Sequence, residues 1–137
     1  IDSLLQRYLT LLDEYTRLRA ALNTVQSGIY HDLARANFSA ERGIRYGQDY
    51  YDDRMQAIRR VAVAAPSGKE EPPKYQQKPP PDPLRWFGIL TPMPLRHAQT
   101  QAARAVEELL PQLATVSAAM AAVELAVRRA RKKRAKA

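Results

Sequence analysis

Apolar residues at the start of the chain recur at alternating intervals of three and four positions. This spacing keeps one stripe of a helix turned toward a partner and is typical of left-handed coiled-coil packing. Charged residues such as Asp13 and Arg17 fall outside the stripe. The stripe consists of Ile1, Leu4, Tyr8, Leu11, Tyr15, Leu18, Leu22 and Val25, with Leu5 and Leu12 beside it.

The pattern passes through Ser27 and Gly28 and continues at Ile29 and Leu33. A glycine inside a helix costs about 1 kcal/mol relative to alanine, a cost that packing can offset. We therefore predict a first long helix over residues 1–37, with a bend near the glycine.

A second long stripe follows residues 91–94, whose two prolines suit the first turn of a helix, where a missing N–H costs nothing. The stripe predicts a helix over residues 94–132. A step of four followed by four around Val106 interrupts the heptad, and Pro111 removes the bond to the Glu107 carbonyl, which predicts a kink. Its members are Leu95, Ala98, Ala102, Val106, Leu109, Leu113, Val116, Met120, Val123 and Val127.

The chain between the two stripes fits no single regular structure. In residues 38–65, the apolar positions from Met55 to Val63 fit an extended segment and a helical turn about equally. We expect an irregular or partly extended middle segment there. Residues 66–83 hold seven of the ten prolines among polar residues, which predicts a flexible Pro-rich linker.

The two predicted helices have nearly equal lengths of about 54 and 58 Å at 1.5 Å per residue. Two long amphipathic helices joined by a flexible segment pack as an antiparallel pair. We therefore predict an all-α protein, an antiparallel two-helix coiled-coil hairpin with an irregular or partly extended middle segment and a Pro-rich linker. Because much of the apolar content is alanine, its core should be thin.

Residues 84–93 hold the only tryptophan and one of the two phenylalanines. Exposed apolar surface costs about 25 cal/mol per Å², so this segment must fold back onto the chain or be covered by another protein. We interpret it as an aromatic docking segment; the alternative, an internal cap on the end of the hairpin, stays open. The predicted partner-binding residues are Trp86, Phe87, Ile89 and Leu90, with Tyr46, Tyr50 and Tyr51 extending the surface.

The net charge of +8 is concentrated near the C-terminus, where residues 128–136 carry seven cations and leave +1 for residues 1–127. These cations are Arg128, Arg129, Arg131, Lys132, Lys133, Arg134 and Lys136. We interpret them as a solvated helix end that leads into a basic tail, residues 133–137. The alternative is contact with anionic lipid or an acidic partner. Nucleic acid is disfavoured because the basic residues lie outside the folded body.

Side chains suited to catalysis or metal binding do not gather in the sequence. The two histidines, His31 and His97, fall on different predicted helices without a nucleophile motif, and His97 is expected on a helix surface. There is no cysteine, and the five glycines form no phosphate-binding loop. No apolar run reaches the roughly 18 to 20 residues that span a bilayer. We predict a non-enzymatic protein without metal or cofactor, soluble or peripheral to a membrane.

Several short motifs resemble those of a known family. In the first part of the chain they are Leu11-Leu12-Asp13-Glu14-Tyr15, Leu33-Ala34-Arg35-Ala36-Asn37-Phe38, Arg45-Tyr46-Gly47 and Tyr51-Asp52-Asp53-Arg54-Met55. The most specific is Asp82-Pro83-Leu84 with Trp86-Phe87-Gly88-Ile89-Leu90. With these motifs the chain resembles the small coiled-coil assembly factor of the vacuolar-type proton ATPase, the peripheral, cytosol-facing member of an assembly complex of the endoplasmic reticulum.

The resemblance covers both predicted helices and omits the Pro-rich linker and the basic tail. It implies a non-enzymatic assembly chaperone on the cytosolic face of the endoplasmic reticulum. The implied partners are a transmembrane assembly factor and the large membrane subunit of the proton ATPase. The alternative functions are a generic coiled-coil scaffold, or a binder of anionic membrane or nucleic acid through the basic tail.

Overall fold

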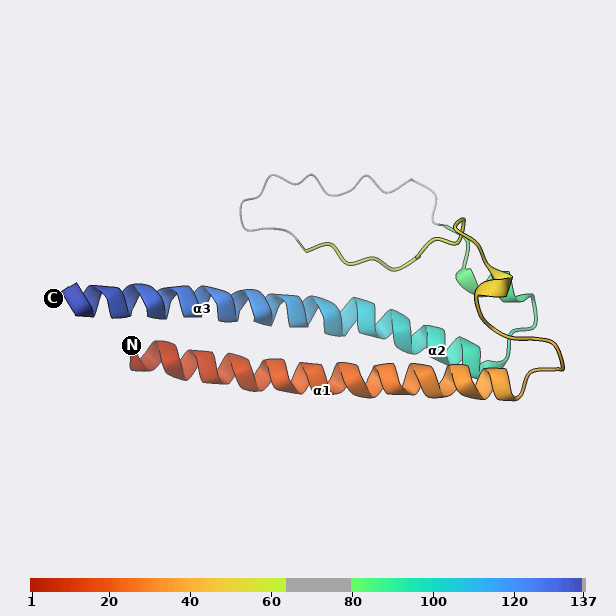
Figure 1. Cartoon of the computed structure of the whole chain (residues 1–137), viewed down its shortest axis with the longest axis horizontal. Coiled ribbons are helices and arrows are strands. Elements are labelled where there is room, and N and C mark those ends of the chain that lie inside the picture. Colours follow the sequence, from red (N-terminus) through yellow and green to blue (C-terminus); the bar gives the residue numbers. More distant parts are fainter. Residues whose placement is uncertain (64–79, 137) are drawn as a thin grey trace.

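The computed structural model describes residues 1–63 and 80–136, and within these residues it is all-helical, without a β-strand (Figure 1). The elements are α1 (Asp2–Phe38), the 3₁₀ turns η1 (Gln48–Tyr50) and η2 (Pro83–Phe87), α2 (Met93–Arg104), the π-helical turn η3 (Ala105–Leu109) and α3 (Leu110–Lys136). The predicted all-α class is confirmed for the described residues.

Helix α1 and the second arm, α2–η3–α3, lie side by side and run in opposite directions (Figure 1). Near the chain termini, Tyr8 Oη donates a hydrogen bond of 3.0 Å to Glu124 Oε1. Toward the opposite end, Asp32 of α1 meets His97 of α2. We call the end with the two termini the open end, and the end where α1 finishes and α2 begins the closed end.

The seam between the arms follows the three–four stripe along α1, which continues at Ile29, Asp32 and Ala36. Among the described residues, no large side chain is fully buried. The buried apolar residues are Ala36, Leu95, Ala98, Ala105, Val116 and Val123. The core is therefore as thin as the alanine-rich sequence predicts.

Gly28 does not interrupt α1, which continues to Phe38. The glycine faces α2, where an added Cβ would lie 2.5 Å from Gln101 Oε1. Gly28 therefore leaves room for the Gln101 side chain to cross the seam. This close approach explains why the helix tolerates the backbone entropy of a glycine here.

The irregularity predicted at Pro111 is the π-helical turn η3, which ends at Leu109, two residues before the proline. From Ala105 to Leu113 the seam advances by two steps of four. Eight α-helical residues turn about 80° beyond two full turns, which would carry the stripe away from α1. A π-turn winds more slowly, since Leu110 N–H bonds the Ala105 carbonyl five residues back. The turn thus keeps both α2 and α3 against α1.

The two arms differ in length within the described residues, whereas the sequence predicted nearly equal lengths. Helix α1 has 37 residues and the second arm, Met93–Lys136, has 44, which correspond to about 55 and 66 Å. The end of α3 extends past the first turn of α1 at the open end (Figure 1). Residues 133–136, predicted as a tail, belong to this helix.

By length and composition, the second arm is also apolar enough to cross a membrane. A count of uninterrupted apolar runs does not reveal this property, because alanines raise the mean hydropathy around a few polar residues. Length and composition alone do not distinguish a membrane span from a helix that packs on a partner. In this structure α1 covers one side of the arm.

The middle segment is irregular apart from η1, and residues 55–63 form neither a strand nor a helix. The predicted Pro-rich linker, residues 66–83, falls mostly outside the described residues. Its last residue, Pro83, begins η2, and the side chain of Asp82 caps this turn by accepting the Leu84 N–H.

Candidate docking site

Four aromatic residues from separate segments pack together near the closed end. The ring of Phe87, in η2, lies 5.8 Å from that of Tyr46, 6.2 Å from that of Tyr50 and 6.1 Å from that of Tyr51, measured between centroids. The contacts with Tyr46 and Tyr51 are edge-to-face, the arrangement that aromatic quadrupoles favour. We call these four residues the aromatic cap.

Trp86 lies beside the cap and is half-buried. The guanidinium carbon of Arg54 lies 5.6 Å from the centroid of the indole ring, within the range of a cation–π contact. Asp52 holds this guanidinium with an ion pair of 2.7 Å. The Arg54 hydrogen bonds in turn lower the pKa of the Asp52 carboxyl. The indole therefore contacts an arginine side chain that Asp52 holds.

Two polar side chains fasten the cap to the helices. At the end of α1, Asn37 Oδ1 accepts the Tyr46 N–H at 2.8 Å. At the start of η2, Asp82 Oδ1 accepts the Leu84 N–H at 3.0 Å and Gln99 Nε2 of α2 at 2.7 Å. Each half of the cap is thus tied to one arm.

The Asp82 bonds make the closed end sensitive to acid. The Leu84 N–H, followed by the Gln99 amide, lowers the pKa of the Asp82 carboxyl. A folded-state pKa below the unfolded value of about 3.9 stabilises the fold above that pH, and this stabilisation is lost as the pH falls through the folded-state pKa. We expect the fluorescence of Trp86, the only tryptophan, to shift toward the red below about pH 4, before helicity is lost.

The matched variant for this measurement is Asp82→Asn, whose amide oxygen still accepts hydrogen bonds but does not titrate in this range. The red shift should be smaller in this variant. An identical pH profile in both proteins would show that Asp82 does not hold the cap.

After the cap the chain turns outward. Gly88 has a φ of +99°, a left-handed conformation that glycine adopts at little cost. The next two side chains, Ile89 and Leu90, are 95% and 92% exposed. Phe38, at the end of α1, and Met93, at the start of α2, are also exposed. We call these four residues, all at the closed end, the exposed apolar group. Large exposed apolar side chains are candidates for contact with a partner.

The structure divides the predicted docking residues into two sets. Trp86 and Phe87 are half-buried, and Phe87 contacts all three predicted tyrosines. Ile89 and Leu90 project from the fold. One part of the segment thus packs as an internal cap, and the other part is exposed. Phe38 was not among the predicted docking residues, although it lies off the apolar stripe where a helix ends, and Met93 lies within the predicted docking segment but was not singled out.

A polar cluster interrupts the seam near the closed end. Asp32 is buried, and its Oδ2 lies 2.5 Å from His97 Nδ1 and 3.4 Å from Gln101 Nε2. The imidazole of His97 is exposed on its outer side, as expected, but its pairing with a buried carboxyl was missed. Counting the heptad from Val25 through Ile29 would have found Asp32, because this count places the carboxyl in the seam. A polar residue at a seam position specifies the register of paired helices.

Removing the His97 side chain should destabilise the fold, because the buried Asp32 carboxyl loses its nearest hydrogen-bond partner. In His97→Ala, Asp32 keeps the long Gln101 contact alone among the described residues, and we expect a loss of about 1–3 kcal/mol in unfolding free energy, measured by circular dichroism. His31→Ala, the other exposed histidine, should leave stability unchanged. The double variant Asp32→Leu/His97→Leu should recover it, because apolar replacement of a buried polar pair is often neutral or stabilising. Equal stability of both alanine variants would refute the pairing.

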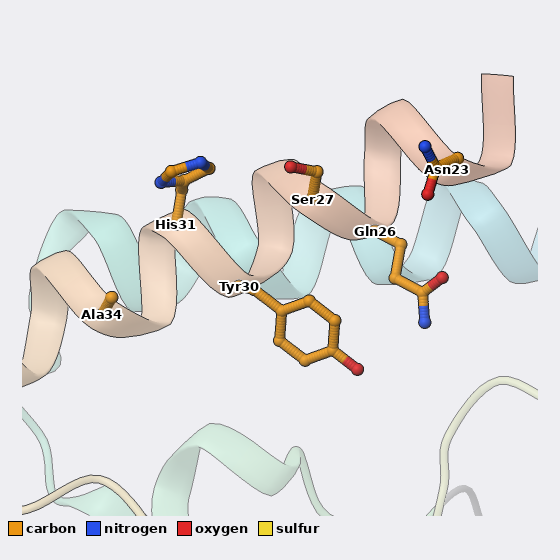
Figure 2. Close-up of a pocket in the computed structure, with 6 residues that line it drawn as sticks. All are labelled: Asn23, Gln26, Ser27, Tyr30, His31 and Ala34. Atoms are coloured by element: carbon orange, nitrogen blue, oxygen red, sulfur yellow. The ribbon is translucent and has the colours of Figure 1, made fainter. Parts of the chain in front are cut away.

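A shallow hollow lies over α1, and Figure 2 shows the residues that line it. Its residues are Asn23, Gln26, Ser27, Tyr30, His31 and Ala34. Ser27 and His31 lie one turn apart, and no hydrogen bond joins them within the described residues. The hollow is thus a polar helix surface in which no nucleophile is paired with a base. The described residues also contain no group of histidine and acidic side chains suited to a metal ion.

These features define an elongated, all-helical protein with exposed apolar side chains at one end and a cationic helix terminus at the other. The Vma22/CCDC115 family matches residues 2–71 and 64–105, more than half of the chain. The chain therefore belongs to the Vma22/CCDC115 family, a family of assembly factors of the vacuolar-type ATPase. The comparisons with curated proteins and with solved structures gave no match.

The family match confirms the resemblance found in the sequence, but it has different limits. It includes α1, the closed end and α2, and it ends at Ala105, the first residue of η3. The match also runs through the Pro-rich linker, residues 66–83, which the expected coverage omitted, so that part of the expectation is wrong. Helix α3 and its cationic end lie outside the match.

Proposed function

We propose that this chain is a non-enzymatic chaperone that binds the membrane-embedded sector of the vacuolar-type proton ATPase during its assembly, on the cytosolic face of the endoplasmic reticulum. Membership of the Vma22/CCDC115 family supplies the assembly role. The observation that supports binding at the closed end is the pair Ile89 and Leu90, almost fully exposed beside a fixed aromatic cap.

The arrangement suits transient binding of an apolar client surface. The hairpin acts as a rigid support, because Asn37 and Asp82 tie the cap to the two arms. A backbone held by the cap reduces the entropy that Ile89 and Leu90 lose when a partner covers them. Burial of Ile89 and Leu90 would contribute about 1.5–3 kcal/mol each. The proposed partners are the large membrane subunit of the ATPase and a transmembrane assembly factor.

Capture from membranes tests this proposal. We expect the full chain, crosslinked and recovered from detergent-solubilised endoplasmic reticulum, to enrich the large membrane subunit of the ATPase and a transmembrane assembly factor. It should also restore ATPase assembly in cells that lack their own factor. Enrichment of neither partner, together with failure to restore assembly, would overturn the proposal.

The alternative of a generic coiled-coil scaffold differs in its oligomeric state. In this structure the seam of α1 is covered by the second arm of the same chain, which favours a monomer. Sedimentation at several concentrations should therefore give one species of monomer mass. A dimer that forms with rising concentration would favour the scaffold.

A further inference from the structure

The open end of the hairpin carries a concentrated positive charge. All seven cations of residues 128–136, the basic end, are exposed, and none forms an ion pair with another described residue. The opposed segments at this end, residues 1–17 and 116–136, contain nine cations and four carboxylates, a net charge of +5. Glu124, one of these carboxylates, accepts a hydrogen bond from Tyr8. The acidic residues therefore do not neutralise the basic end.

The cations of the basic end surround the helix. At about 100° per residue, the seven cations point to all sides of α3. Ile1, Arg131 and Arg134 line one shallow hollow at this end, and α3 extends past the first described turn of α1 (Figure 1). The end of α3 therefore presents positive charge in several directions, which suits adsorption to an anionic surface more than a pairwise contact with one acidic site.

Exposed leucines accompany this charge. Leu5, Leu9 and Leu12 are exposed and spaced by four and three residues, so they share one side of α1. Leu125 is exposed on α3, one turn before the basic end. Aliphatic side chains beside a cationic cluster can enter the boundary between headgroups and acyl chains. They give no comparable gain on a nucleic acid, whose exterior is a phosphate backbone.

From this combination we infer that the open end is a docking surface for the anionic headgroups of a lipid membrane. The basic end supplies long-range attraction, and the leucines supply shallow insertion. The inference does not rest on client binding at the closed end, because the two surfaces lie at opposite ends of the rod. It also owes nothing to the family match, which ends before α3.

Cosedimentation of the full chain with lipid vesicles tests the inference. We expect binding to phosphatidylcholine vesicles with about 30% phosphatidylserine, little binding to pure phosphatidylcholine, and release at about 0.5 M salt, where charges are screened. The variant K132Q/K133Q/R134Q/K136Q should bind at least ~100-fold more weakly, since each cation near an anionic surface contributes about fivefold. The matched control R35Q/R42Q/R45Q/R85Q loses the same charge at the closed end, where all four arginines are exposed, and should bind almost as well as the unmodified chain.

A second variant separates lipid from nucleic acid. L9Q/L125Q should weaken vesicle binding severalfold and leave binding to a short DNA duplex unchanged. Binding to duplex DNA or RNA that is tighter than binding to anionic vesicles would assign the basic end to nucleic acid and overturn the inference. Equal loss of vesicle binding in K132Q/K133Q/R134Q/K136Q and in R35Q/R42Q/R45Q/R85Q would also overturn the inference, because binding would then depend on net charge alone. Vesicle binding that persists at high salt would overturn the inference as well, because it would indicate that the second arm inserts into the membrane.

Discussion

Replacing both Ile89 and Leu90 with serine is expected to abolish capture of the membrane-sector partner without changing the thermal unfolding of the hairpin. Both side chains are almost fully exposed, so the folded chain loses no packing, and surface substitutions of this kind change stability by at most about 0.5 kcal/mol. In a complex, the same two residues would lose about 3–6 kcal/mol of apolar burial, a loss of affinity of about 10²- to 10⁴-fold. Quantitative capture from solubilised membranes and a circular dichroism melt give the two readouts.

The control for this variant is Leu9→Ser/Leu125→Ser, which removes two exposed leucines from the open end. It should retain capture, because the proposed client surface lies at the closed end. Undiminished capture by the Ile89/Leu90 variant would remove these residues from the docking site. A lower melting temperature would instead show that they contribute to the fold.

The periodicity of the first arm predicted both the helix and the side that it buries, since one repeating interval determines both. The burial of Asp32 in the seam was not predicted. A search for apolar residues moves from Ile29 to Leu33, whereas the geometric repeat leads to the carboxyl, which the structure buries. Spacing is thus a better guide to a seam than residue type, and a polar residue at a seam position indicates a specific partner across it.

For the π-turn, the sequence predicts the position of an irregularity but not its type. The double step of four and the proline located an irregularity in the second arm to within about one turn. Its type could not be predicted from the second arm alone. A π-turn, a kink or a drift of the stripe would all fit this sequence, and the choice depends on continued contact with α1 on both sides of Ala105.

The closed end was the least predictable region, because its contacts join segments far apart in the chain. Aromatic density alone could not show that Tyr46 would meet Phe87. Nor could it separate the buried from the exposed part of the segment. That division depends on the positive φ of Gly88, a local backbone conformation that reverses which side of the chain faces the fold.

The two phenylalanines of this chain allow a matched test of that division. Phe87→Ala should open the aromatic cap, because Phe87 contacts three tyrosine rings. We expect a local loss of about 2 kcal/mol, less than the 3–5 kcal/mol of a fully buried phenylalanine, since this ring is half-buried. The reporter is the Tyr46 amide, which donates to Asn37 Oδ1, and its hydrogen exchange should become about 30-fold faster.

Phe38→Ala removes the same ring from a position that is 93% exposed. Exchange at Tyr46 should then stay unchanged while capture of the membrane partner weakens. Phe87→Ala is therefore expected to lower cap stability, and Phe38→Ala to weaken binding without lowering cap stability. Equal acceleration of Tyr46 exchange in both variants would mean that the cap and the exposed apolar group form one cooperative unit. The division of the tryptophan segment into a support and a binding surface would then be wrong.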